Sequence, residues 1–343
     1  MKRPCTRAIV HGADRAPVRR GVRLALASIL LLLFVAALCV GAVTLSPLDL
    51  PALLLAHDDA PLAIVVAQIR LPRALLAIVV GASLGLAGAA LQGLLRNPLA
   101  EPGIIGVSGM AALAAVLTFY TGLAAASVWI LPLGGMLGAL AAVAVLALLS
   151  GRDTSILTLI LAGVAINSLA GALTTLVLNL TSNPFAAYEI FFWLLGSLAN
   201  RSFEHLLMIA PFTMIGWLLL LRTGRGLDAL SLGEDTAASL GVDTQRLRRR
   251  VILGTALTVG SAVAVSGVVG FVGLVVPHLL RPLVGHRPGA LLSASMLGGA
   301  TLTLAADLGT RVPLPQGELK LGVVTALIGA PFFLHLVLRG RAR

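Results

Sequence analysis

Long runs without a single Asp, Glu, Lys or Arg constrain this 343-residue chain more than any other feature of its sequence. Such runs include residues 24–48, 102–151 and 251–280. A helix that crosses a membrane needs about 20 mostly apolar residues, so each run is long enough for at least one crossing. The alternating ten-residue segments of a membrane barrel are absent. The sequence therefore predicts an all-α integral membrane protein.

The composition excludes two other classes of protein. Hydrophobic residues make up 58% of the chain and charged residues only 11%, and the mean hydropathy is +1.00. A soluble domain has about 25% charged residues, and a disordered chain is polar and rich in charge. The net charge of +11 comes from short basic clusters between apolar runs. Such clusters orient membrane helices, so we do not expect the chain to bind nucleic acid.

The apolar runs divide into ten predicted crossings. They cover residues 21–43, 72–95, 103–121, 126–149, 154–180, 204–222, 250–267, 270–284, 288–306 and 319–338. With this division all but five of the 25 Lys and Arg residues fall on one side of the membrane; the exceptions are Arg70, Arg73, Arg201, Arg311 and Lys320. Basic residues accumulate on the cytoplasmic side, so both termini are predicted to be cytoplasmic.

Three regions follow from this topology. Residues 1–23 form a basic cytoplasmic tail, residues 24–338 form the transmembrane domain, and residues 339–343 form a second cytoplasmic tail. The longest polar stretch between crossings is 223–249, and within it residues 232–242 read as a short helix. Glu234 suits the start of that helix and Gly241 suits its C-cap. Such a helix could dock a partner or be an ordinary connection, and composition alone leaves both open.

The sequence contains no recognisable motif for catalysis, nucleotide binding or metal binding. A phosphate-binding loop would end in Gly-Lys-Ser/Thr, but neither lysine, Lys2 or Lys320, follows a glycine. The six histidines are scattered, and no metal-binding spacing occurs. Charges are nearly missing from the centres of the predicted crossings, which argues against proton- or ion-coupled transport. We therefore expect no catalytic, metal or cofactor site. A self-powered transporter or channel, or a membrane enzyme, remains a less favoured alternative.

Several motifs in a fixed order resemble the FecCD-type permeases. These are the membrane subunits of ABC importers for ferric siderophores, haem and cobalamin. The motifs are Arg70-Leu71-Pro72-Arg73, Arg96-Asn97-Pro98-Leu99-Ala100-Glu101-Pro102-Gly103, Trp193-Leu194-Leu195-Gly196-Ser197, and Gly270-Phe271-Val272-Gly273-Leu274 with Pro277 and His278. The resemblance extends over about residues 24–338. It implies the ten-helix fold of a type II ABC importer permease in the bacterial plasma (inner) membrane.

The resemblance also implies partners. These would be a cytoplasmic ABC ATPase dimer, a periplasmic or lipid-anchored substrate-binding protein, and a second permease copy, as a homodimer or with a paralogue. A ferric siderophore is the first expected cargo, with haem and cobalamin as alternatives. The wall of the path is expected to include residues 167–196. ATP hydrolysis would take place on the ATPase, so the chain is not expected to be an enzyme.

Two sets of residues are expected to carry these contacts. By resemblance, the ATPase-coupling helix comprises Gly233, Glu234, Ala237, Leu240 and Gly241. Arg70, Arg73 and Arg311 match positions that receive glutamates of the binding protein. An arginine fork suits a carboxylate. The alternative is that these arginines snorkel to lipid headgroups or pair with Asp307 and Glu318 within the subunit.

Overall fold

A computed structural model describes residues 15–41, 43–55, 61–149, 156–312 and 318–341. Within these ranges the chain forms helices and no β-strand. Six helices are long and apolar enough to cross a membrane. They belong to α1 (Arg15–Cys39), α4 (Leu71–Leu94), α6 (Ile130–Leu149), α7 (Ile156–Leu180), α9 (Phe203–Leu221) and α14 (Pro288–Thr310). The all-α membrane fold predicted from the sequence is therefore confirmed.

The other four predicted crossings also contain a helix. They are α5 (Val107–Tyr120), α12 (Thr244–Ser266), α13 (Val272–Leu280) and α15 (Leu321–Arg341). Helix α5 is apolar but has only 14 residues, the shorter apolar part of α15 covers Leu321–His335, and α12 begins with a basic turn. The arrangement is compatible with the ten predicted crossings.

The polar and connecting segments form shorter helices. Near one end of the bundle are α10 (Gly224–Leu230) and α11 (Glu234–Ser239). Near the other end are α2 (Leu50–Leu55), α3 (Pro61–Ile64) and α8 (Pro184–Leu194). Two 3-10 turns, η2 (Pro102–Ile105) and η3 (Leu123–Ala125), flank α5.

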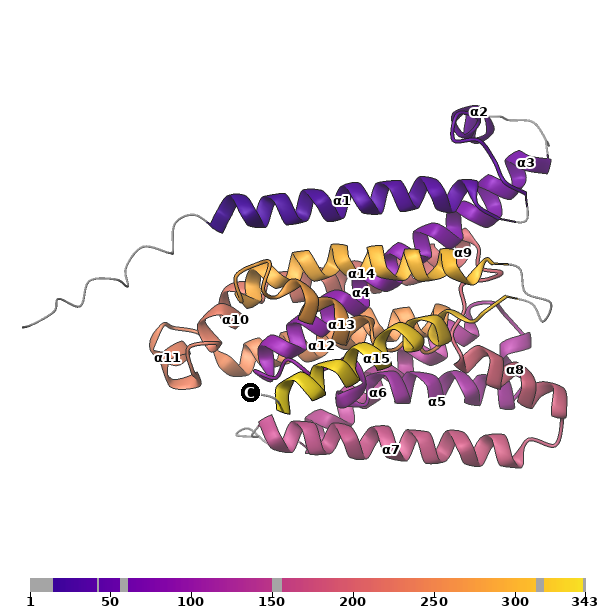
Figure 1. Ribbon diagram of the computed structural model, residues 1–343. Helices are drawn as coiled ribbons and strands as arrows, with labels where there is room; N and C mark the ends of the chain where they lie inside the picture. The colour runs from indigo at the N-terminus through magenta and orange to yellow at the C-terminus, as the bar shows by residue number, and fades with distance from the viewer. Residues whose placement is uncertain (1–14, 42, 56–60, 150–155, 313–317, 342–343) are drawn as a thin grey trace, which may run out of the picture.

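Helix α4 occupies the centre of the bundle and packs closely on α14 (Figure 1). An added Cβ at Gly81 would collide with the carbonyl oxygen of Gly299, and one at Gly85 with that of Ser295. Only glycine therefore allows the two backbones to approach so closely, as the small-residue motifs of membrane helices do.

The second crossing begins earlier than its predicted start at residue 72. Helix α3, the π-helical turn η1 (Val65–Arg70) and α4 together form one apolar helix over Pro61–Leu94. The prediction stopped at Arg70 because a charged residue is unfavourable in a membrane helix. In the structure, Arg70 is buried and donates hydrogen bonds to backbone carbonyls at the end of α1, so its charge is solvated by protein.

The predicted crossing at 270–284 is wrong as a continuous helix. Helix α13 has nine residues and is about 14 Å long at 1.5 Å per residue, which is half the thickness of the hydrocarbon core. Before it, Gly267 and Phe271 adopt positive φ angles of 70° and 67°, which break the helical path. Non-helical backbone is tolerated at membrane depth where it is buried in protein, as Val269 is here.

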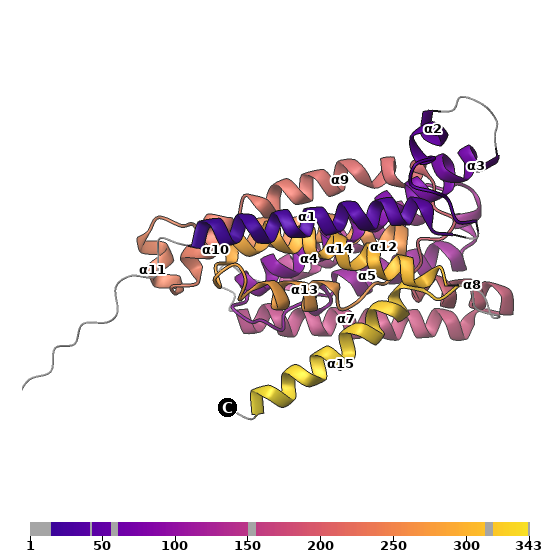
Figure 2. The ribbon, with the colours of Figure 1, turned by 45° about the horizontal axis from the view of Figure 1, so that its top comes forward.

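The two ends of the bundle differ, as the topology requires. Figure 1 places α10, α11, the start of α1 and the end of α15 at one end, and α2, α3 and α8 at the other. The basic residues assign the first of these ends to the cytoplasm. Figure 2 shows α15 diverging from the other helices toward the same end. Of the predicted tails, residues 15–23 and 339–341 are helical, whereas residues 1–14 and 342–343 lie outside the described residues. The same holds for residues 150–153, which connect the predicted crossings 126–149 and 154–180.

Candidate functional site

Helix α11 forms the cytoplasmic tip of the molecule, where a coupling helix is predicted (Figure 1). Two glycines frame it: Gly233 has φ 113° and Gly241 has φ 80°, and both angles are unfavourable for other residues. Ala237, a residue of α11, is fully buried, and its carbonyl accepts a hydrogen bond from the backbone N–H of Val242. The two glycines and the buried Ala237 therefore define the conformation of the tip.

The outer surface of the tip carries apolar side chains. Leu240 is 62% exposed and Leu232 is 64% exposed, on either side of α11. This end of the molecule faces the cytoplasm and has no lipid to cover such side chains. Exposed apolar groups with polar surroundings are typical of a protein interface.

Two ion pairs attach the tip to the bundle. Glu234 Oε1 of α11 lies 4.0 Å from Arg248 Nη2 of α12. Asp228 of α10 accepts hydrogen bonds from the backbone N–H of Gly289 at 2.8 Å and from Arg287 Nη2 at 3.0 Å. These contacts join α11 to the first turns of α12 and α10 to the start of α14.

At the opposite end, the three arginines expected to dock a binding protein have partners within the chain. Arg70 donates to the carbonyl oxygens of Leu38 at 2.8 Å and Cys39 at 2.9 Å, where α1 ends. A cation at this place satisfies the last carbonyls of a helix and suits its negative dipole end.

Arg73 and Arg311 share one carboxylate. Asp307 is completely buried; its Oδ1 lies 3.0 Å from Arg73 Nε and its Oδ2 lies 2.7 Å from Arg311 Nη2. Arg73 also donates to Glu318 Oε2 at 3.1 Å and to Thr310 Oγ1 at 3.0 Å. We call Arg70, Arg73, Asp307, Arg311 and Glu318 the outer charge cluster. The intrasubunit pairs considered in the sequence analysis are present, and docking of a binding protein stays a prediction.

Sequence reasoning missed the polar contact that holds the broken helix α13. Gln92 of α4 donates to the carbonyl oxygens of Gly273 at 3.4 Å and Leu274 at 3.3 Å, and accepts from Arg281 Nη2 at 2.6 Å. Gln92 thus links the two ends of α13 to the central helix. The signal that could have found it is a single buried amide in an otherwise apolar crossing.

Helix α7 presents two different stripes on its exposed side. Leu169, Leu173 and Leu176 form an apolar stripe, whereas Ser168, Thr175 and Asn179 lie at helical spacing on another face. An added Cβ at Gly171, within the polar stripe, would meet no atom within 4 Å. Thr175 donates to the backbone carbonyl of Gly171 at 3.0 Å, so the unfavourable cost of polar groups against lipid applies mainly to Ser168 and Asn179, and such groups are typical of a water-filled path or a protein interface.

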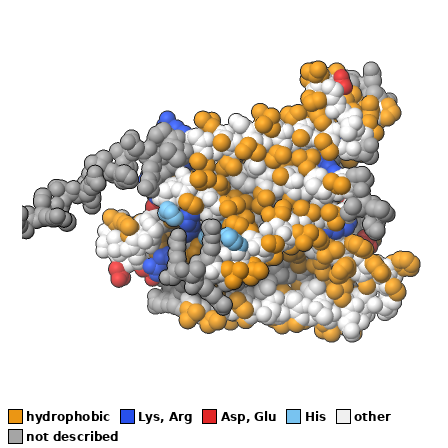
Figure 3. Space-filling model, viewed as in Figure 1, with side chains coloured by type: hydrophobic (Ala, Val, Ile, Leu, Met, Phe, Trp, Pro, Cys, Tyr) orange, Lys and Arg blue, Asp and Glu red, His pale blue; other side chains and the backbone are white. Residues whose placement is uncertain are grey.

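The space-filling view in Figure 3 agrees with a membrane location. Hydrophobic side chains cover the length of the visible face, while Lys and Arg side chains appear toward its two ends. Among the described residues no group of three or more His, Cys, Asp or Glu side chains is placed to hold a metal ion.

Comparison with known proteins identifies the family. Residues 29–339 match the FecCD transport family. The chain belongs to the FecCD transport family. Its relatives within this family include the vitamin B12 import system permease protein BtuC of Vibrio cholerae, which is 45% identical over 277 residues, covering 79% of this chain and 82% of that protein.

A second FecCD relative and a solved structure extend the similarity over nearly the whole chain. The Fe(3+)-citrate import system permease protein YfmE of Bacillus subtilis is 39% identical over 319 residues, covering 92% of this chain and 93% of that protein. A solved ABC transporter assigned to the metal-chelate type, in an inward-facing conformation, matches with a TM-score of 0.84 and 36% identity, covering 93% of this chain and 99% of that one. This FecCD protein is therefore a multi-pass permease subunit of an ABC importer.

Proposed function

We propose that this permease carries a metal chelate into the bacterial cytoplasm across the plasma (inner) membrane, and that a ferric siderophore is the first cargo to test. The likeness to permeases named for Fe(3+)-citrate and for vitamin B12 supports the chelate class. Haem and cobalamin are the alternative cargoes.

The observation that carries the proposal is the cytoplasmic tip. Helix α11 projects from the bundle with Leu232 and Leu240 exposed, and it is attached to α12 through Glu234. In our proposal these leucines enter a groove of an ABC ATPase, and closure of the ATPase pair on ATP moves the tip. The movement shifts the permease between inward- and outward-facing states, because the ATPase binds one state better than the other.

A second copy of the permease would complete the path. The polar stripe of α7, made of Ser168, Thr175 and Asn179, is open in the single chain. In our proposal two such stripes face each other across the path in a homodimer. Pairing with a paralogue would serve equally, provided that its facing helix is also polar.

The outer charge cluster is the proposed docking site for a periplasmic or lipid-anchored binding protein. Glu318 is the cluster carboxylate nearest to solvent, with 49% of its side chain exposed, and it pairs with Arg73. A glutamate of the binding protein could replace Glu318 on Arg73, whereas Arg70 and Arg311 would shape the surface from below. Bidentate Arg–carboxylate contacts suit such a site.

Uptake into proteoliposomes tests the proposal. The vesicles would hold this permease with its co-encoded ATPase and binding protein, and the cargoes would be a ferric siderophore, haem and cobalamin, each with and without ATP on the cytoplasmic side. We expect one chelate to accumulate only with ATP and all partners. Accumulation without ATP, or without the ATPase, would instead establish a self-powered transporter.

Two substitutions test the role of the tip in the same vesicles. Glu234→Gln removes the charge that faces Arg248, and Gly241→Val strains the positive φ at the end of α11. Both should leave the folded permease intact while ATP turnover continues with less uptake. Normal uptake with normal ATPase activity in both variants would contradict the assignment of α11.

A further inference from the structure

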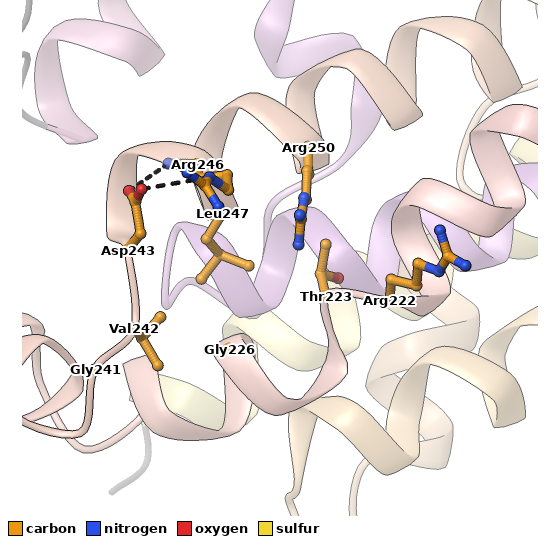
Figure 4. A pocket seen from close by; sticks show the side chains of 9 residues that line it. All are labelled: Arg222, Thr223, Gly226, Gly241, Val242, Asp243, Arg246, Leu247 and Arg250. Atoms are coloured by element: carbon orange, nitrogen blue, oxygen red, sulfur yellow. Dashed lines mark hydrogen bonds and ion pairs between the residues drawn. The ribbon is translucent and has the colours of Figure 1, made fainter.

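A second site lies between the cytoplasmic tip and the membrane. A pocket of about 250 Å³ opens where α9, α10 and α12 meet the connection 241–243 (Figure 4). Its lining includes Arg222, Arg246 and Arg250 together with the apolar side chains of Val242 and Leu247. The coupling surface of α11 described above uses none of these side chains.

The pocket carries excess positive charge. Its one acidic residue, Asp243, is occupied by Arg246, whose backbone N–H donates to it at 2.8 Å and whose Nε lies 3.5 Å away. In the part of the chain that the structure describes, no ion pair or hydrogen bond engages the guanidinium of Arg222 or Arg250. Figure 4 shows Arg250 reaching from α12 toward Thr223, and Arg246 turned back onto Asp243. In this view Arg222 points away from Arg250, so its exposed side chain has to turn toward the pocket to join Arg250 on an anionic ligand.

The depth of the pocket is set by the crossing helices. Arg222 directly follows the apolar span Phe203–Leu221, so it lies at the level where the hydrocarbon core ends. The walls come together above it, since an added Cβ at Gly216 of α9 would lie 3.0 Å from the carbonyl oxygen of Gly254 in α12. The pocket thus opens at the height of the cytoplasmic headgroups.

Apolar side chains continue from the arginines toward the membrane. On α9, Leu218 is exposed one helical turn before Arg222; on α12, Leu253 is exposed one turn after Arg250. The surface therefore has a cationic part at headgroup level and an apolar part directly above it. That order of charge and hydrocarbon is the order found in a phospholipid of the inner leaflet.

We infer that this pocket binds the phosphate of an anionic phospholipid of the cytoplasmic leaflet, with Arg222 and Arg250 on the phosphate and the acyl chains along Leu218 and Leu253. Basic pockets between helices on the cytoplasmic side are suited to anionic headgroups. The volume accommodates a headgroup, so the acyl chains lie outside the pocket. The inference does not depend on the cargo or on the proposed ATPase contact.

Native mass spectrometry of the purified full-length permease, titrated with phosphatidylglycerol, tests the site. We expect the double variant Arg222→Gln/Arg250→Gln to bind phosphatidylglycerol about thirtyfold more weakly, because two arginines near the surface together contribute on the order of 2 kcal/mol. The matched control is Arg225→Gln/Arg249→Gln, which removes the same charge from exposed arginines of α10 and α12 outside the pocket. Equal losses in both double variants would show only non-specific surface charge and overturn the site.

Two further arms separate the sources of phosphate and the other possible occupant. A large excess of inorganic phosphate should leave phosphatidylglycerol bound; displacement would mean a site for free phosphate. Assembly with the ATPase should also leave it bound; loss on assembly would assign the pocket to the ATPase interface. Either displacement by inorganic phosphate or loss on assembly would overturn the inference.

Labelling of the unmodified protein covers the case in which a variant does not fold. Phosphatidylglycerol with a photoactivatable group on its acyl chain should label the peptides that contain Leu218 and Leu253. Labelling spread evenly over the apolar surface, without enrichment in these two peptides, would contradict the assignment.

Discussion

At the scale of single residues, the outer charge cluster shows how one buried carboxylate organises a membrane surface. Asp307 lies between Arg73 and Arg311 and neutralises part of the charge of both. Because Asp307 is fully buried, water cannot replace it as a partner of either guanidinium. Glu318 pairs with Arg73 as well, but it is half-exposed, and its contribution is screened by solvent.

This difference predicts unequal effects of two similar substitutions. Asp307→Asn should destabilise the isolated permease by about 3–5 kcal/mol, because it leaves buried Arg311 without its anion and Arg73 with only the half-exposed Glu318. Glu318→Gln should change stability by no more than about 1 kcal/mol. Denaturation of the purified permease, without any binding protein, provides the measurement. Equal effects of the two variants would show that Asp307 is not the centre of the cluster.

The half-buried carboxyl of Glu101 predicts a pH-dependent stability. Glu101 lies in the turn between α4 and η2, and burial raises the pKa of its carboxyl. A raised folded-state pKa favours folding below the unfolded pKa, and that contribution is lost as the pH rises through the folded value. Glu101→Gln removes the charge at all pH values. The variant should therefore match the wild type near pH 4 and be more stable at pH 8.

Thermal unfolding of the two proteins across this pH range gives the answer. The gap in Tm between Glu101→Gln and the wild type should widen toward alkaline pH. A constant gap, or one that widens toward acidic pH, would contradict the raised pKa.

At the scale of elements, the packing of two helices depends on whether there is room for a Cβ atom between their backbones. Gly85 lies against the backbone of α14, where an added Cβ would collide with the carbonyl oxygen of Ser295. Gly309 lies in α14 with no atom within 4 Å of such a Cβ. Gly85→Ala should destabilise the permease by about 1–3 kcal/mol through overpacking. Gly309→Ala should not, and the comparison uses the Tm of the two purified variants.

The joint between α10 and α14 gives a prediction about coupling. Asp228 holds both the backbone N–H of Gly289 and the side chain of Arg287, so it joins α10 to the start of α14. Helix α14 in turn packs on the central helix α4. Asp228→Ala should weaken the coupling free energy by about 0.5–2 kcal/mol. Uptake per ATP hydrolysed should then fall about two- to thirtyfold while ATP turnover continues.

The control for this joint is Arg225→Gln. Arg225 is an exposed residue of the same helix, and no described residue forms an ion pair with it. Its replacement should leave uptake per ATP unchanged in the proteoliposomes. If Asp228→Ala also left this ratio unchanged, α10 would not act through Asp228, although the importer assignment would stand.

At the scale of the whole molecule, the exposed side of α7 indicates where the single chain is incomplete. The polar stripe with Thr175 borders the proposed path, whereas Leu173 belongs to the apolar stripe. We expect Thr175→Cys in the assembled importer to react at least about tenfold faster with a hydrophilic maleimide than Leu173→Cys. A thiol reacts as its thiolate, which forms in water and not in lipid.

Both cysteine variants are made in a chain whose native cysteines, Cys5 and Cys39, are replaced by serine. The labelled fraction is then read from the mass of the purified permease. Equal rates for the two positions would place both stripes in the same surroundings and remove the support for a path along α7.

The sequence by itself determined the class of the protein and the order of its parts. Apolar runs of sufficient length have few alternatives to a membrane helix, because every backbone group must be hydrogen-bonded inside the bilayer. The short helix at 234–239 was also readable, since acidic residues at its start and Gly241 after its end are local signals. These features depend on neighbours in the sequence and on the solvent.

Only the tertiary structure decided how buried polar groups are satisfied. Arg70 could lie within a helix because carbonyls of α1, about 30 residues away in the chain, accept its hydrogen bonds. Gln92 of α4 satisfies two carbonyls within α13, and the outer charge cluster depends on bringing Arg73 to Asp307. In each case the favourable state of a polar residue is set by a partner distant in sequence, and hydropathy along the chain contains no information about that partner.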